Sequence, residues 1–371
     1  ARVRALGAFW RRERLRVAAR ALWGEASEPD SVGEELSDVA RAMLEGLLRA
    51  AAARAGAEAV LPRLAVIGLG KFGGRELNFP SDGDLLYVHE RPEDGPAAAA
   101  VADAVRVLMG RVRREQNVDM EFDPRLRPGG RFGPLSRTPA SYAAFYEREA
   151  ATWEKQALLK ARPVAGSPDL GARWMTEARD PAVYAAPITD EQTNEIRAMK
   201  QRIENERLRP AERHTDLKLG LGAMSDIEWI AQLLQWRHGA AHPSVRAPGT
   251  RAALHALQHA GLLGRGDLLT LTETYDLLQR LRNAIYLRTG LPGDTLPSSA
   301  PPQNGPSGKR PEGERRLGVL ARLVLPPDPG SGGQEEQGPN AAAAERLRAE
   351  HERRTRTVRD VFRRLFLGEK G

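Results

Sequence analysis

Asp82 and Asp84, which lie two residues apart, have the type and spacing in this chain best suited to chemistry. They stand where a predicted strand begins, so their carboxylates project to the same face. Two like charges held side by side repel each other unless a cation lies between them. Oxygen-only ligation by few protein groups suits Mg²⁺, which takes its remaining ligands from water and substrate phosphates. The pair therefore predicts a magnesium site.

Asp123 is the best candidate for a third carboxylate, because it ends a later predicted strand just before Arg125 and Arg127. Two metal ions held by three carboxylates would align an attacking hydroxyl, the α-phosphate of a nucleotide and a pyrophosphate leaving group. In this arrangement Asp123 also helps to deprotonate the attacking hydroxyl. The three aspartates predict nucleotidyl transfer.

The segment before the acidic pair is rich in glycine. By itself it is weak evidence, because an ordinary tight turn has the same composition and its spacing matches neither a P-loop nor a dinucleotide-binding fingerprint. Its place ahead of a serine and the acidic pair favours a phosphate-binding role, with the backbone of a glycine pair at a helix start. The predicted nucleotide-binding residues are Gly70, Lys71, Gly73, Gly74, Ser81 and Arg127.

The elements that position these residues follow from the hydrophobic pattern. Short apolar or alternating runs predict strands at residues 64–69, 84–88 and 118–123, with a helix at 96–114 between the last two. Two helices precede them, separated by a turn at 25–30. Helical patterns then recur at 153–162, 190–209, 226–238, 250–262 and 267–288. The predicted fold class is α+β: a small mixed sheet flanked by helices, followed by an all-helical bundle.

Shifts in composition along the chain predict five regions. They are N-terminal helices at 1–57, a catalytic core at 58–140, a helical bundle at 141–290, a flexible Pro/Gly-rich insertion at 291–340 and a basic C-terminal helix at 341–371.

Composition excludes several classes of function. The 371 residues include no cysteine, which excludes disulfides, thiolate metal sites and cysteine nucleophiles. The net charge of +7 is weak evidence for a nucleic-acid partner, because arginine replaces lysine almost everywhere beside abundant alanine, glycine and proline, a bias typical of a GC-rich genome. Aromatic residues are only 5% and are not interleaved with the basic runs, which argues against nucleic acid as a partner. With no apolar run long enough for a bilayer, we expect no membrane partner and a cytoplasmic location.

Three other features have simpler explanations than function. His255 and His259 are spaced to share a metal, but no third ligand is evident, so a half-exposed helix face is expected. Ser225 and Glu228 form a capping-box pattern and are expected to hold the bundle against the sheet. The arginines near the C-terminus are expected to pair with glutamates on a solvated helix face: Arg346, Arg348, Arg353, Arg354, Arg356 and Arg359.

Four separated blocks resemble the glutamine synthetase adenylyltransferase family, within the DNA polymerase β-like nucleotidyltransferase superfamily. The first is the glycine-rich and acidic segment at 68–84. The others lie at 122–135, at 153–162 and at 216–232. The chain departs from the family pattern at Ala223, where a glycine is usual, and at Gly83, where a larger residue is common.

The resemblance implies that AMP is transferred from ATP to a tyrosine hydroxyl of glutamine synthetase, with Mg²⁺ as the cofactor. Full-length members of the family have two homologous halves, and this chain contains one copy. The second half removes AMP by phosphorolysis, and a PII signalling protein and glutamine set the balance. We expect the adenylylating half, with the deadenylylating half as the alternative. A catalytically silent regulatory half and a nucleic-acid nucleotidyltransferase are more distant alternatives.

Overall fold

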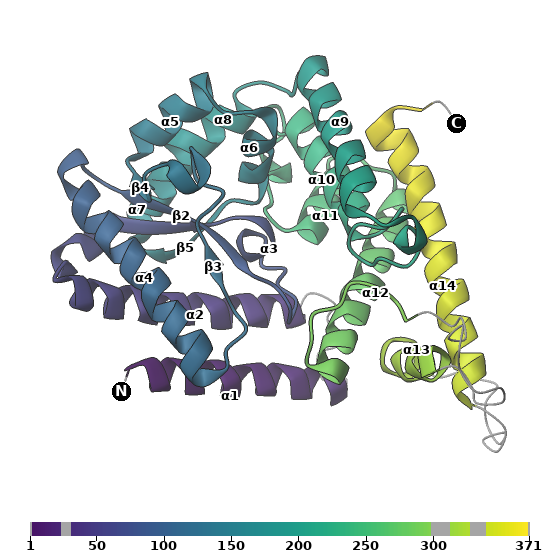
Figure 1. The fold of residues 1–371 in the computed structure, drawn as a ribbon. Helices are drawn as coiled ribbons and strands as arrows, with labels where there is room; N and C mark the ends of the chain where they lie inside the picture. Colours follow the sequence, from purple (N-terminus) through teal and green to yellow (C-terminus); the bar gives the residue numbers. More distant parts are fainter. Residues whose placement is uncertain (1, 24–30, 298–311, 327–338, 370–371) are drawn as a thin grey trace. The chain divides into compact units, whose positions relative to one another are not determined.

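The computed structural model describes residues 2–23, 31–297, 312–326 and 339–369 (Figure 1). The chain forms two compact units. The first contains residues 1–196 and 232–262, and the second contains residues 197–231 and 263–371. Helices α9 and α10 each contribute residues to both units.

A mixed five-stranded sheet forms the centre of the first unit. Its strands are β1 (Leu64–Gly68), β2 (Gly83–His89), β3 (Phe122–Asp123), β4 (Ser136–Arg137) and β5 (Arg162–Gly166). The order is β3-β2-β1-β5, and β4 also pairs with β2. β1 is antiparallel to β2 and β5, whereas β3 and β4 run parallel to β2. Every residue of β1 is buried, as its apolar sequence predicts.

Two of the three predicted strands, β1 and β2, are confirmed almost to the residue. The third is shorter than predicted, because only two residues of the stretch 118–123 pair in the sheet. β5 was not predicted, since its residues follow a helical pattern that was extended to residue 162. The observed helix there ends at Ala157 and is followed by a single 3₁₀ turn before the strand.

Helices surround the sheet in the first unit. α1, α2 and α4 pack against one another, and α2 also contacts β5 while α4 contacts β2 and β4. α7 contacts β1, β2 and β5, and the short α3 lies against the same three strands (Figure 1). The helices of this unit, with the two shared ones, are α1 (Arg2–Trp23), α2 (Ser31–Ala55), α3 (Gly70–Gly73), α4 (Gly95–Gln116), α5 (Pro139–Arg148), α6 (Thr152–Ala157), α7 (Pro168–Trp174), α8 (Asp180–Tyr184), α9 (Asp190–Arg207), α10 (Met224–His238) and α11 (Thr250–His259).

The second unit is helical in its described part, apart from one isolated β-bridge between Asp216 and Thr295. α12 (Arg265–Thr289), α13 (Glu312–Val324) and α14 (Pro339–Phe362) pack against one another. α13 corrects the prediction of a flexible insertion over 291–340. Its apolar residues recur at helical spacing, and Leu317, Leu320 and Val324 are buried. The most proline-rich and glycine-rich parts of that insertion lie outside the described residues.

Candidate active site

Asp84 and Asp123 occupy directly paired positions on the parallel strands β2 and β3. Paired residues on neighbouring strands project to the same face of a sheet, so the two carboxylates share one side. A Cβ added at Gly70 would lie 2.9 Å from Oδ2 of Asp84. Gly70 also has a φ of +52°, which favours glycine. The acidic start of β2 and the glycine turn thus meet at one place.

The carboxylates of Asp82, Asp84 and Asp123 suit a divalent cation, because carboxylate oxygens bind such ions and because Asp84 and Asp123 are paired on neighbouring strands. Asp82 is exposed and Asp84 is half-buried, so solvent and substrate reach them. Within the described residues, however, no three acidic or histidine side chains are grouped closely enough to hold a metal together. The observed geometry therefore supports a pair of carboxylates, and a third ligand remains a prediction.

Asp123 is engaged by Arg125 in this conformation. The backbone N–H of Arg125 donates to Oδ1 of Asp123 at 2.9 Å, and its guanidinium donates to Oδ2 at 2.6 Å. Partial burial of the Asp123 carboxylate raises its pKa, but the hydrogen bonds from Arg125 outweigh burial and the net pKa is below the ordinary value. Asp123 is therefore ionised at neutral pH, as a metal ligand or a proton acceptor must be.

The glycine-rich turn is a short helix closed by a Schellman motif. The N–H of Glu76 donates to the carbonyl of Lys71 at 2.8 Å, and the N–H of Arg75 donates to the carbonyl of Phe72 at 3.3 Å. Arg75 takes the left-handed position, with a φ of +58°, where glycine is usual. Its guanidinium is held by Asp38 of α2 at 2.8 Å.

Gly73 and Gly74 lie at the end of α3, so the prediction that they stand at a helix start is wrong. Close packing explains both residues. A Cβ at Gly73 would lie 2.0 Å from the carbonyl oxygen of Lys160, and one at Gly74 would lie 3.0 Å from that of Pro248. Leu69 and Gly70 are the residues at the start of α3.

A buried ion pair supports the glycine turn from behind. Nζ of Lys160 lies 2.8 Å from Oε2 of Glu76, and both side chains are almost fully buried. The Thr250 hydroxyl donates to the same oxygen at 3.1 Å, and the Thr250 backbone N–H donates to Oε1. Glu76 therefore also satisfies the N-terminus of α11, where a negative charge is stabilising. This role of Glu76 was not predicted from the sequence, although Glu76 and Lys160 both lie in blocks that resemble the family.

Two other predicted nucleotide-binding residues have structural partners. The Ser81 hydroxyl accepts a hydrogen bond from the N–H of Asn78 at 2.9 Å and so closes the turn before Asp82. Arg127 is buried, and its guanidinium donates to the carbonyls of Pro124, Arg131 and Gly133 at 2.8–3.0 Å. These bonds shape the loop after β3, and the role of Arg127 in nucleotide binding stays a prediction.

The block at 225–232 forms a buried ionic network in the second unit, rather than a capping box. Ser225 lies inside α10, which begins at Met224. Nζ of Lys200 lies 2.8 Å from Oγ of Ser225 and 2.7 Å from Oδ1 of Asp226. Arg359 of α14 bonds Oδ2 of Asp226 at 2.8 Å and also pairs with Glu204. The buried pair of Lys200 and Asp226 is thus joined by the half-buried pair of Arg359 and Glu204, so each charge lies beside one of opposite sign.

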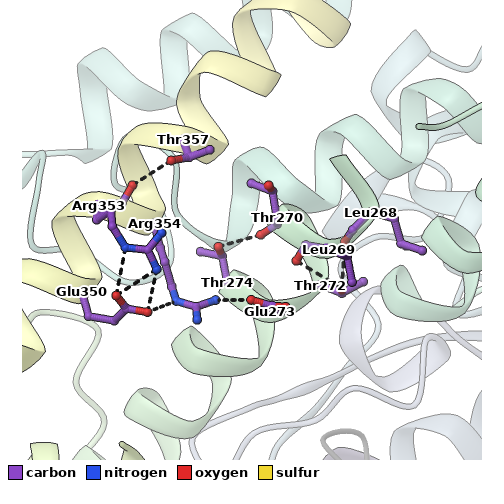
Figure 2. A network of polar contacts seen from close by, with 10 residues as sticks. All are labelled: Leu268, Leu269, Thr270, Thr272, Glu273, Thr274, Glu350, Arg353, Arg354 and Thr357. Atoms are coloured by element: carbon purple, nitrogen blue, oxygen red, sulfur yellow. Dashed lines mark hydrogen bonds and ion pairs between the residues drawn. The ribbon is translucent and has the colours of Figure 1, made fainter. Parts of the chain in front are cut away.

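Arg353 and Arg354 of α14 pair with a glutamate, as predicted, whereas Arg359 lies in the half-buried network instead of on a solvated face. Figure 2 shows Glu350 accepting hydrogen bonds from both Arg353 and Arg354. Arg354 also reaches Glu273 of α12 at 3.1 Å, so it links the two helices. Because these guanidiniums have carboxylate partners, they are poorly placed to bind phosphates. His259 on α11 bonds a backbone carbonyl at 2.8 Å and is exposed, as expected.

Comparison with known proteins identifies the family. The family model of glutamate-ammonia ligase adenylyltransferase matches residues 1–177, and that of GlnD PII-uridylyltransferase matches residues 197–366. A bifunctional glutamine synthetase adenylyltransferase/adenylyl-removing enzyme of Leifsonia xyli subsp. xyli is 37% identical over 98% of the chain. The protein of that name from Streptomyces coelicolor is 41% identical over 78%. The chain belongs to the glutamate-ammonia ligase adenylyltransferase family.

This chain spans about a third of the length of these relatives: 33% of the Leifsonia protein and 30% of the Streptomyces protein. The family model and these relatives confirm the family resemblance that the sequence motifs indicated. The mixed sheet followed by helices confirms the α+β class. In the described part of the chain, no helix is both long enough and apolar enough to cross a bilayer.

Proposed function

We propose that this chain transfers AMP from ATP to a tyrosine hydroxyl of glutamine synthetase, releasing pyrophosphate. The observation that most supports chemistry at an adenylyl phosphate, in either direction, is the register that places Asp84 opposite Asp123, beside the turn at Gly70. The name of the relatives includes adenylyl transfer to glutamine synthetase. ATP as substrate is consistent with a cytoplasmic setting.

In the proposed mechanism, Asp82, Asp84 and Asp123 would hold Mg²⁺, which would neutralise charge on the triphosphate. The backbone at Gly70 and the ammonium group of Lys71 bind the phosphates. The tyrosine oxygen forms a bond to the α-phosphorus, and the bond from that phosphorus to the pyrophosphate oxygen breaks, with its electron pair leaving on pyrophosphate. The tyrosine proton passes to the ionised carboxylate of Asp123.

Removal of AMP from adenylylated glutamine synthetase by phosphorolysis is the second candidate activity, because the relatives are named for adenylyl removal as well. In that reaction an oxygen of inorganic phosphate forms the new bond to the α-phosphorus, and the tyrosine oxygen is the leaving group that takes up a proton. The same three aspartates serve both reactions, so the site geometry alone favours neither.

One experiment separates the two candidates. The purified chain is incubated with unmodified glutamine synthetase, Mg²⁺ and ATP labelled at the α-phosphate. Label on glutamine synthetase, lost on omission of Mg²⁺, supports adenylyl transfer. If no label transfers, adenylylated glutamine synthetase and phosphate are supplied instead, and release of ADP supports the second candidate. Silence in both assays contradicts catalysis by this chain.

The second unit is the proposed contact for a PII signalling protein. Its support is the match of residues 197–366 to the PII-uridylyltransferase model. Addition of purified PII protein to the transfer assay tests this proposal. A change in rate that depends on PII concentration is the expected result, and an unchanged rate together with absence of binding contradicts it.

A further inference from the structure

Arg14 of the N-terminal helix α1 joins two segments that are distant in sequence. Its Nη2 donates to the carbonyl of Phe79 at 3.0 Å, and its Nη1 forms an ion pair with Asp119. The Arg14 side chain is only 12% exposed. Its guanidinium lies 5.2 Å from the ring centroid of Phe79 and 5.4 Å from that of Trp10, distances at which a cation is attracted to an aromatic face.

Both segments lead directly into the candidate active site. Phe79 lies three residues before Asp82, and Asp119 lies four residues before Asp123. The Arg14 guanidinium, ion-paired with Asp119 and hydrogen-bonded to Phe79, therefore acts on the two strands that carry the carboxylates. Nε1 of Trp10 donates to the same Asp119 oxygen at 3.4 Å, which holds this junction from a second side.

The strand pairing at the site is too short to set this spacing alone. β3 contains two residues and makes two register pairs with β2. One further backbone hydrogen bond, from Gly83 to Glu121 at 2.8 Å, precedes them. A ladder of this length contributes little cooperative stability, because strands gain strength from many paired residues. The contacts of Arg14 with Phe79 and Asp119 lie outside this ladder and restrain the two strands.

We propose that Arg14 is a positioning residue for the metal site: it fixes the separation of the Asp84 and Asp123 carboxylates by holding both strand entries. This inference rests on the proposed function, because that function gives the two carboxylates their task. Arg14 contributes no atom to the site and acts through the backbone of the two segments. Groups that support metal ligands from outside typically change metal affinity by about 10–100-fold when they are removed.

A purely structural role for Arg14, anchoring α1, predicts something different. α1 has a separate anchor on α4, because the Arg11 guanidinium bonds both the carbonyl and the side-chain oxygen of Gln116. Gly7 packs directly on the same glutamine. Loss of Arg11 should therefore loosen α1 without moving the strand entries, which makes it the matched control.

The experiment compares wild type, Arg14→Met, Arg14→Lys and Arg11→Met in the full chain. Mn²⁺ binding is measured by calorimetric titration, and kcat and the KM for glutamine synthetase are measured separately. Arg14→Met should weaken Mn²⁺ binding and lower kcat by about tenfold or more each, with KM nearly unchanged. Arg14→Lys keeps the charge but not the forked geometry, and should fall between Arg14→Met and wild type. Arg11→Met should stay within about twofold of wild type.

The inference is overturned if folded Arg14→Met has the Mn²⁺ affinity and the kcat of wild type. It is also overturned if Arg11→Met loses as much Mn²⁺ affinity and kcat as Arg14→Met does. If Arg14→Met does not fold, the milder Arg14→Lys variant decides by the same two measurements. A wild-type chain that binds Mn²⁺ but transfers no AMP would contradict the proposed function, and the Mn²⁺ affinities would still test Arg14. A wild-type chain that binds no Mn²⁺ overturns the inference as well.

Discussion

Lys160 Nζ lies 2.8 Å from Glu76 Oε2, so two residues 84 positions apart in the chain form one buried ion pair. A Cβ added at Gly73 would lie 2.0 Å from the carbonyl oxygen of Lys160. Arg162, two residues further on, donates to the carbonyls of Gly73 and Phe72 at 2.9 and 3.2 Å. The segment around Lys160 therefore supports the glycine turn through both side chains and backbone.

Removing one partner of this pair should destabilise the first unit strongly. Glu76→Gln leaves the Lys160 ammonium buried without its counter-charge and weakens the bonds at the start of α11. The expected loss in the free energy of unfolding is about 3–5 kcal/mol, measured by urea unfolding. The double variant Glu76→Gln/Lys160→Met should recover part of that loss, because neither charge is then buried.

The matched control is the exposed pair of Asp103 and Arg106 on α4, whose side chains are 52% and 65% exposed. Arg106→Ala should change the free energy of unfolding by less than about 1 kcal/mol. A Glu76→Gln loss no larger than this control would show that the buried pair does not stabilise the fold.

Asp84→Asn should abolish metal-dependent AMP transfer and leave the fold intact. The substitution removes one charge of the paired carboxylates while keeping nearly the same shape beside Gly70. Labelled-ATP assays measure transfer, and circular dichroism with a melting curve measures folding. Asp103→Asn, on the exposed face of α4, is the control and should transfer AMP at the wild-type rate. Turnover by a well-folded Asp84→Asn protein close to wild type would refute the site assignment.

Gly73→Ala should be severely destabilising or prevent folding. Its Cβ would lie 2.0 Å from the Lys160 carbonyl oxygen and 2.5 Å from that of Gly68, and neither backbone group can retreat without disturbing the sheet. Gly266→Ala in α12 is the control, because nothing lies within 4 Å of its added Cβ. That change should be neutral, or stabilising by up to about 1 kcal/mol. Soluble expression and melting temperature distinguish the two, and equal behaviour would contradict the packing argument.

His351 should make the second unit less stable in mild acid. Burial lowers the pKa of His351 to about 4, from an ordinary 6.5, with the charge of His214 as a smaller cause. The native state therefore keeps His351 neutral, while the unfolded chain takes up a proton below pH 6.5. Stability is full above that pH and falls by up to about 3 kcal/mol as the pH drops towards 4.

Urea unfolding of wild type and His351→Gln at pH 7, 6 and 5 measures this effect. The variant should lose the part of the pH dependence that belongs to this window, whatever its stability at pH 7. An unchanged slope for His351→Gln would contradict the buried neutral imidazole.

The sequence alone determined the strands β1 and β2, most helices, the α+β class and the family. These follow from local information: apolar runs and helical spacing act within a few residues, and the motif at 68–84 is contiguous. The meeting of Gly70 with Asp84 was also predictable, because a tight turn links neighbouring elements. α13 was missed because the proline-rich and glycine-rich segments around it dominated the composition of residues 291–340.

Only the tertiary structure decided which distant residues meet. The short pairing of Asp84 with Asp123, the strand β5 and the burial of Lys160 against Glu76 each depend on contacts between segments 39 to 101 residues apart. Arg14 resembled any other arginine on an amphipathic helix until the fold brought Phe79 and Asp119 to it. A charged side chain acquires its role from the partners that surround it after burial, and no local pattern encodes those partners.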